Sequence, residues 1–147
     1  MAVGVVRANP CLVHGCHSCC INNEMPLRDS DIARLESLGY RREDFVRVVD
    51  GVRVLATRED GSCFFLGDDG LCSVYESRPE GCRLYPLVWH VDGGRAVLDA
   101  DCPYRHEFSF GPDAVARLMD LVREIYGEEV LKGRAAHRRR RCRASGR

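Results

Sequence analysis

Hydrophobic residues recur with the period of an α-helix in two stretches of the chain. The first stretch, over residues 30–38, places three apolar residues on one face: Ile32, Leu35 and Leu38. Ser30 can cap its N-terminus, and Gly39 suits the left-handed position that follows a helix. The second stretch opens at Pro112, a residue favoured in the first helical turn. Its apolar stripe contains Val115, Leu118, Leu121, Val122 and Ile125.

Short hydrophobic runs separated by tight-turn residues predict β-hairpins. The three candidate turns are Asp50-Gly51, Asp68-Asp69-Gly70 and Asp92-Gly93-Gly94. Apolar and β-branched residues flank the first and third turns, over residues 45–55 and 88–98, whereas Cys63 and Cys72 flank the second. Residues 11–28 show no sustained periodicity, so we expect a loop ordered by whatever its cysteines bind. The pattern predicts a small α+β domain with short hairpins and two main helices around a cysteine-ligated metal centre.

The chain of 147 residues contains nine cysteines. Its apolar start, residues 1–6, is too short for a signal-peptide core, and no later run approaches the roughly 20 apolar residues of a membrane span. We therefore expect a soluble, cytoplasmic protein without a membrane partner. Cytosolic thiols are kept reduced, which favours metal ligation over a disulfide framework, although intracellular disulfides occur in hyperthermophiles.

Charge divides the chain into an acidic body and a basic tail. Residues 132–147 contain eight Lys or Arg and no acidic residue, whereas residues 1–131 contain 14 basic and 22 acidic residues. We expect a metal-binding domain over residues 1–131 and a disordered tail over residues 132–147. The tail can neutralise nucleic-acid phosphates, or it can fold back on the acidic body as a solubilising arm. Cys142 lies within it and is expected to be a free thiol.

The remaining cysteines form a tight group followed by a dispersed one. Together they are the eight candidate metal ligands: Cys11, Cys16, Cys19, Cys20, Cys63, Cys72, Cys82 and Cys102. Zinc knuckles and iron–sulfur loops share a Cys-x2-Cys pair, but no second pair follows to complete an ordinary zinc ribbon. The Cys-x4-Cys-x2-Cys spacing that begins at Cys11 also occurs in plant-type two-iron ferredoxins. These spacings favour an iron–sulfur centre, with zinc as the alternative.

Several neighbours of the cysteines bear on the predicted centre. Adjacent side chains such as those of Cys19 and Cys20 point to opposite sides of an extended backbone. Both could bind metal in a polynuclear centre or in two separate sites. Alternatively, one of the two packs in the core and binds no metal. His14 and His17 can replace a thiolate, but hydrogen-bonding or surface roles are favoured. Three arginines can offset thiolate charge or pair with the acidic body: Arg78, Arg83 and Arg105. Three aromatic residues can shelter the centre from water, although core packing is favoured for each one singly: Tyr75, Tyr85 and Trp89.

Two segments make the sequence recognisable. They are Gly-Ser-Cys-Phe-Phe-Leu at 61–66 and Gly-Leu-Cys-Ser-Val-Tyr-Glu-Ser-Arg-Pro-Glu-Gly-Cys-Arg-Leu-Tyr-Pro at 70–86. The chain resembles the YkgJ-type cysteine-cluster family, also called the zinc- or iron-chelating domain, from about Cys11 to Cys102. The resemblance implies metal chelation by the cysteines. The family commonly begins with Cys-x2-Cys-x2-Cys-Cys, and the longer first gap here places Cys11 last among the predicted ligands.

Three functions are consistent with these residues. The leading prediction is a non-catalytic iron–sulfur or iron-binding protein that serves electron transfer, cluster handling or metal storage, with a redox or metal-handling partner protein. The second is a structural zinc domain that presents its basic tail to nucleic acid or a protein partner. The third is a small methyltransferase or redox enzyme, because relatives in the family include flagellin lysine methylases. No Gly-x-Gly-x2-Gly or phosphate-binding loop supports a separate cofactor pocket, so catalysis is the less favoured function.

Overall fold

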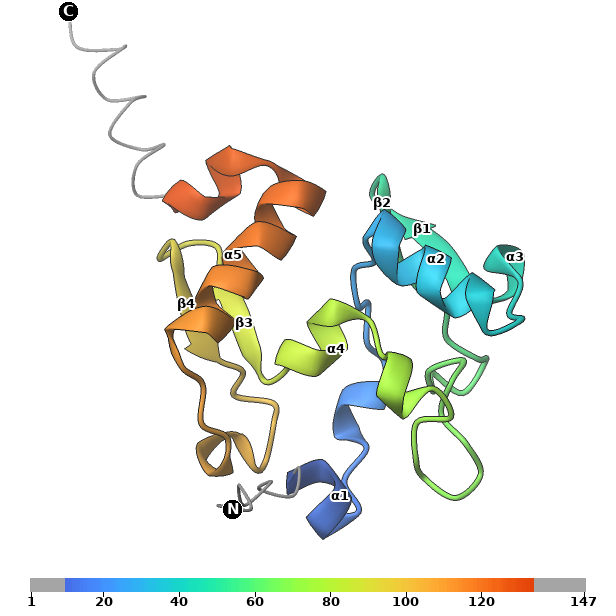
Figure 1. Ribbon diagram of the computed structural model, residues 1–147. Helices are drawn as coiled ribbons and strands as arrows, with labels where there is room; N and C mark the ends of the chain where they lie inside the picture. The colour runs from blue at the N-terminus through green and yellow to red at the C-terminus, as the bar shows by residue number, and fades with distance from the viewer. Residues whose placement is uncertain (1–9, 134–147) are drawn as a thin grey trace, which may run out of the picture.

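The computed structural model describes residues 10–133 (Figure 1). Its α-helices are α1 (Pro10–His14), α2 (Asp29–Ser37), α3 (Arg42–Phe45), α4 (Glu80–Leu84) and α5 (Pro112–Tyr126). Its strands are β1 (Val46–Val49), β2 (Val52–Leu55), β3 (Leu87–His90) and β4 (Arg95–Leu98). Short 3-10 helices cover Ser18–Cys20, Tyr75–Ser77, Arg105–Glu107 and Glu128–Lys132. The predicted α+β fold is confirmed, whereas Cys142 and most of the predicted tail lie outside the described residues.

Helix α2 confirms the first predicted helix, although its N-terminus is built differently. Ile32 and Leu35 are fully buried, and Gly39 has a φ of +100°, the left-handed conformation expected after the helix. Ser30 does not cap. The N-cap residue is Arg28, whose backbone N–H donates to Asp31 Oδ2 at 2.9 Å, so a carboxylate inside the first turn satisfies the helix end.

Two of the three predicted hairpins form antiparallel strand pairs. In the β1–β2 pair, Val49 lies opposite Val52, and the two turn residues, Asp50 and Gly51, both have positive φ. This turn conformation matches the right-handed twist of the strands. The β3–β4 pair runs from Leu87 opposite Leu98 to the turn over residues 91–94.

The hairpin predicted around residues 68–70 does not form strands. Only single bridges occur there, between Leu66 and Cys72 and between Thr57 and Cys63. The Asp69 side chain accepts a hydrogen bond from the backbone N–H of Leu71 at 3.1 Å, and Gly67 N–H donates to Leu71 O at 2.8 Å. These local hydrogen bonds close a compact loop, and the segment that remains is too short to form paired β-strands.

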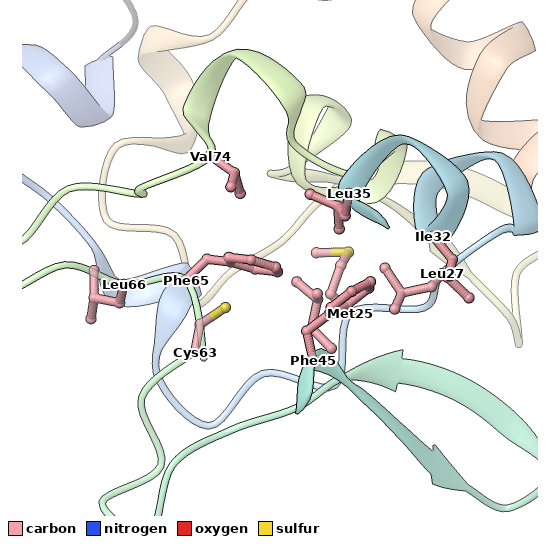
Figure 2. Close-up of a cluster of buried hydrophobic side chains, with 10 residues drawn as sticks. Met25, Leu27, Ile32, Leu35, Phe45, Cys63, Phe65, Leu66 and Val74 are labelled. Carbon is pink, nitrogen blue, oxygen red and sulfur yellow. The ribbon is translucent and has the colours of Figure 1, made fainter. Parts of the chain in front are cut away.

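The hydrophobic side chains form two clusters, one on each side of α4 (Figure 1). The first lies among α2, β2 and the loop that carries Cys63; it contains Met25, Leu27, Ile32, Leu35, Phe45, Leu55, Cys63, Phe65, Leu66 and Val74 (Figure 2). The second lies between α5 and the β3–β4 pair; it contains Leu84, Leu87, Leu118, Leu121 and Val122. Helix α5 confirms the second predicted helix and begins at Pro112. No helix within residues 10–133 combines the length and apolar character needed to cross a membrane.

Candidate metal centre

Seven of the eight predicted ligands line one cavity of about 80 Å³. They are Cys11, Cys16, Cys19, Cys20, Cys63, Cys72 and Cys82. Met25, Phe65 and Val74 of the first hydrophobic cluster line the same cavity. The fold therefore brings together thiols from three parts of the sequence and places them against the hydrophobic core. Which of these thiols bind metal stays a prediction.

The N-terminal cysteines are positioned by two short helical turns. Cys16 N–H donates to Cys11 O at 2.9 Å at the end of α1, so the long first gap of the motif is taken up by this helix. The expected loop over residues 11–28 therefore contains helical turns. Cys20 N–H donates to His17 O at 2.8 Å in the next turn. Cys11 and Cys19 both line the cavity, and each affects the pKa of the other.

Backbone pairing joins the N-terminal cysteines to the dispersed ones. Cys63 N–H donates to Cys20 O at 2.7 Å, and Asn22 N–H donates to Gly61 O at 2.7 Å. The bridge between Leu66 and Cys72 returns the chain toward the cavity. Residues about forty positions apart in sequence are thus held side by side by strand-like hydrogen bonds, before any metal is considered.

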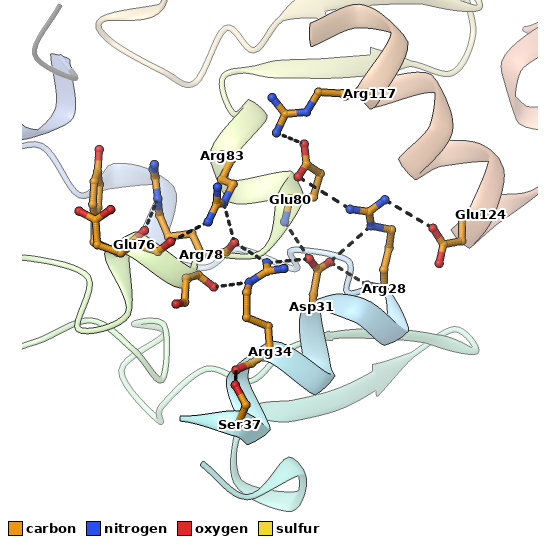
Figure 3. A network of polar contacts seen from close by, with 12 residues as sticks. Arg28, Asp31, Arg34, Ser37, Glu76, Arg78, Glu80, Arg83, Arg117 and Glu124 are labelled. Atoms are coloured by element: carbon orange, nitrogen blue, oxygen red, sulfur yellow. Dashed lines mark hydrogen bonds and ion pairs between the residues drawn. The ribbon is translucent and has the colours of Figure 1, made fainter. Parts of the chain in front are cut away.

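Cys82 enters the cavity from α4, whose start is fixed by a buried carboxylate. Arg78 has the extended conformation that the following proline imposes, with φ −51° and ψ 145°. Arg34 donates to Arg78 O at 2.8 Å, and the fully buried Asp31 accepts hydrogen bonds from Arg34 at 3.1 Å and from Glu80 N–H at 3.1 Å (Figure 3). Helix α2 therefore holds the entrance of α4 by hydrogen bonds to both sides of the Arg78–Pro79 peptide.

Burial and the neighbouring sulfurs raise the pKa of several cavity thiols in the chain without metal. The pKa of Cys82 is raised well above the ordinary value by burial and then by the nearby sulfurs of Cys63, Cys19 and Cys72. Burial also raises the pKa of Cys63 and of Cys72. The Cys11 thiol lowers the pKa of Cys19 by donating a hydrogen bond, but Cys20, burial and the neighbouring sulfurs outweigh it and raise that pKa to about 12. Metal binding must therefore release protons from this cavity.

Of the three predicted charge-compensating arginines, only Arg78 lines the cavity. Its guanidinium lies 3.9 Å from the centre of the Tyr75 ring. The pKa of Cys11 is raised mainly by its hydrogen bond to Cys19, and those of Cys72 and Cys82 mainly by burial; the positive charge of Arg78 opposes part of each rise. Arg83 donates instead to the carbonyls of Arg78 and Glu76, and Arg105 donates to those of Ala100 and Cys102. The latter two arginines therefore brace the backbone around the cysteines.

Cys102 and Trp89 occupy other positions than expected. Cys102 is buried, with 5% of its surface exposed, but it does not line the cavity. The pKa of its thiol is raised mainly by burial and, to a smaller extent, by the nearby sulfurs of Cys11 and Cys16. Tyr75 and Tyr85 line the cavity as predicted. Trp89 does not, because β3 turns it toward the second hydrophobic cluster, which gives it the core-packing role rather than the sheltering one.

The two histidines of the N-terminal segment behave differently. His14 stacks on the Tyr104 ring at 3.9 Å and contacts Glu107 Oε1 through Nε2 at 2.9 Å, which ties α1 to the segment after Cys102. His17 lines the cavity beside the cysteines. His17 therefore stays a candidate ligand, and His14 has the hydrogen-bonding role that was favoured.

The cysteines surround the cavity without closing on a single point. Among residues 10–133, no three Cys, His, Asp or Glu side chains converge closely enough to form a ready site for one ion. The donor set nevertheless fits thiophilic metal, since seven thiols and one imidazole line the cavity and no carboxylate of the described residues does. This arrangement suits a group larger than one tetrahedral ion, or thiols that move inward when metal binds.

Sequence reasoning missed two polar residues that shape this site. Asp31 joins α2 to α4 through its hydrogen bond with Glu80 N–H. Asn23 lines the cavity, and its Nδ2 donates to Cys19 O at 2.6 Å. An acidic residue three positions after a helix N-cap was a usable signal for Asp31, but nothing local marked its contact with Glu80.

Comparison with protein families agrees with this cysteine-lined cavity. The family model CxxCxxCC, described as a "Putative zinc- or iron-chelating domain", matches residues 10–107, the part of the chain that contains all eight candidate ligands. No match was found among curated proteins or among solved structures. The family match covers more than half of the chain, and we conclude that this chain belongs to the CxxCxxCC family.

Proposed function

We propose that this chain is a non-catalytic iron–sulfur or iron-binding protein of the cytoplasm, acting in electron transfer, cluster handling or metal storage. The observation that carries the proposal is the number of thiols on one cavity: seven, where a structural zinc ion takes four ligands. The ligands would come from Cys16, Cys19, Cys20, Cys72 and Cys82 first, with Cys63 and Cys11 also available. When bound, an iron–sulfur cluster supplies reversible electron transfer.

The surroundings of the thiols support a redox or storage role over a purely structural one. A single zinc ion with four thiolates would leave three sulfurs without metal in a partly apolar cavity. Iron–sulfur clusters are larger than one ion, and their potentials depend on hydrogen bonds, net charge and exposure. Arg78 supplies a positive charge at the cavity, and Phe65 and Met25 limit its contact with water. These residues would tune a cluster held there.

Metal analysis of protein purified without oxygen tests the proposal. We expect a brown protein that contains iron and acid-labile sulfide, or iron alone if the chain stores the metal. Colourless protein with one zinc per chain and no iron would overturn it. The Cys142→Ser variant, whose thiol lies outside the matched family region, is the control for nonspecific loading.

A structural zinc domain with a nucleic-acid-binding tail is the second candidate. It is favoured by the family description, which places zinc beside iron, and by the eight basic residues of 132–147. It predicts binding to nucleic acid that weakens steeply with salt and disappears when the chain is truncated before Lys132. Binding that survives truncation would show that the tail is not its cause.

A further inference from the structure

A second cavity, of about 290 Å³, lies between β3 and α5 on the other side of Tyr85 from the cysteines. Its walls are mainly apolar and include Leu87, Trp89, Leu118, Leu121 and Val122. This volume is at the lower end of the range for small-molecule sites, roughly 300–1,000 Å³. Tyr85, Met25 and Asn23 line both cavities, so the two spaces are neighbours that share one wall.

One carboxylate faces this apolar space. Asp99 lines the cavity, accepts a hydrogen bond from Tyr85 Oη at 2.9 Å through Oδ2, and accepts another from Asp101 N–H at 3.0 Å through Oδ1. Within the described part of the chain, no Lys, Arg or His forms an ion pair with Asp99. A half-buried negative charge with only neutral donors is complementary to a cation.

The cavity opens to solvent beside a further acidic residue. Val91 and Tyr126 line it and are 44% and 46% exposed, so they mark its mouth. Burial and the nearby carboxylate of Glu24 both raise the pKa of Tyr126, and Glu24 itself pairs with Arg47 at 4.0 Å. The apolar walls would hold the hydrocarbon part of a cation that reaches Asp99.

We propose that this second cavity is a binding site for a small, mainly apolar amine, whose ammonium group contacts Asp99 while its hydrocarbon part packs between Trp89 and α5. A bound amine touches Tyr85 and therefore lies next to the cysteine cavity. The site requires no particular metal, so it is separate from the function proposed above.

Fluorescence titration with benzylamine tests this proposal. Trp89 is the chain's only tryptophan, so its emission reports directly on the cavity wall. We expect saturable quenching or a spectral shift with benzylamine, and at least about tenfold weaker binding of benzyl alcohol and of benzoate, because neither places a cation beside Asp99. No change of Trp89 emission with benzylamine, or equal binding of benzoate, would overturn the proposal.

Two variants and a matched control make the result specific. Asp99→Asn should weaken benzylamine binding at least about tenfold while keeping an acceptor for Tyr85. Asp113→Asn removes the same charge from an exposed position outside the cavity and should bind as the unmodified chain does. If Asp99→Asn does not fold, Val122→Phe, which fills the cavity from α5, should abolish binding. Unchanged binding in Val122→Phe, or equal loss in both Asn variants, would refute the site.

Discussion

The Asp31→Asn substitution removes the charge at the centre of the network that holds α4. Asp31 is fully buried, and its two oxygens accept hydrogen bonds from Arg28 N–H, Arg34 and Glu80 N–H (Figure 3). An asparagine keeps one acceptor oxygen but turns an NH₂ group toward a backbone donor. The substitution therefore loses an ion pair and places two donors against each other.

The expected cost follows from the environment of these groups. Removing one partner of a buried ion pair costs about 3–5 kcal/mol, and a charge-assisted hydrogen bond contributes about 1.5–3 kcal/mol. The Arg34 side chain is 34% exposed and that of Arg28 is 22% exposed, so water can recover part of the loss. We expect the free energy of unfolding to fall by about 2–3 kcal/mol. Metal content should fall as well, because the same network fixes the turn before Cys82.

Urea denaturation and metal analysis of two variants measure these effects. Asp29→Asn is the matched control: it changes the same residue type in the same helical turn, but Asp29 is 82% exposed, and within residues 10–133 its ion pair is with Arg53 at the surface. Its cost should stay below about 1 kcal/mol. Equal stability of the two variants would refute the reasoning about burial. A destabilised Asp31→Asn variant with full metal content would contradict the role of the network in placing Cys82.

Three further predictions concern the thiols. Cys16→Ser and Cys82→Ser should each lower the metal bound per chain, whereas Cys142→Ser should not, and unchanged metal content in the first two would contradict the ligand assignment. The chain without metal should lose stability as the pH rises above 9.0, the ordinary pKa of a thiol. Burial raises the pKa of Cys82 in the folded state, so the unfolded chain releases that proton at lower pH than the folded chain does. Denaturation at several pH values measures this, and a flat stability profile above pH 9.0 would contradict it. Metal removal should speed hydrogen exchange at the Cys63 amide more than in α5, because only the former lies beside the cavity; equal acceleration would contradict a local role for the metal.

Local signals explain what could be predicted from the sequence. Asp50-Gly51 between β-branched runs specified a hairpin, and Pro112 followed by an apolar stripe specified α5, because each depends on neighbouring residues. The same kind of signal wrongly predicted a hairpin at Asp69, because the Asp69 side chain accepts a hydrogen bond from Leu71 N–H and the segment forms a turn without paired strands. The cysteines themselves were the candidate ligands, and the segments at 61–66 and 70–86 indicated the family, but the spacing of the cysteines could not show which thiols share a space.

Long-range contacts account for most of what the sequence did not reveal. The hydrogen bond from Glu80 N–H to Asp31 spans 49 positions, and nothing near either residue indicates it. The direction of Trp89 depended on which face of β3 meets α5, and a four-residue strand with a mixed pattern does not specify that face. The second cavity likewise exists only because segments near Met25, Tyr85 and α5 meet in the folded chain.

Helix α4 couples the two cavities. With five residues it is too short to be stable alone, so its position depends on Asp31 and Arg34 on one side and on the ion pair between Glu80 and Arg117 of α5 on the other. Its Cys82 lines the cysteine cavity and its Gly81 lines the second one. A side chain at Gly81 would place a Cβ 2.3 Å from the sulfur of Met25, which lines both. Movement of α4 therefore changes both cavities at once, and any effect of metal on ligand binding must be matched by an equal effect of ligand on metal.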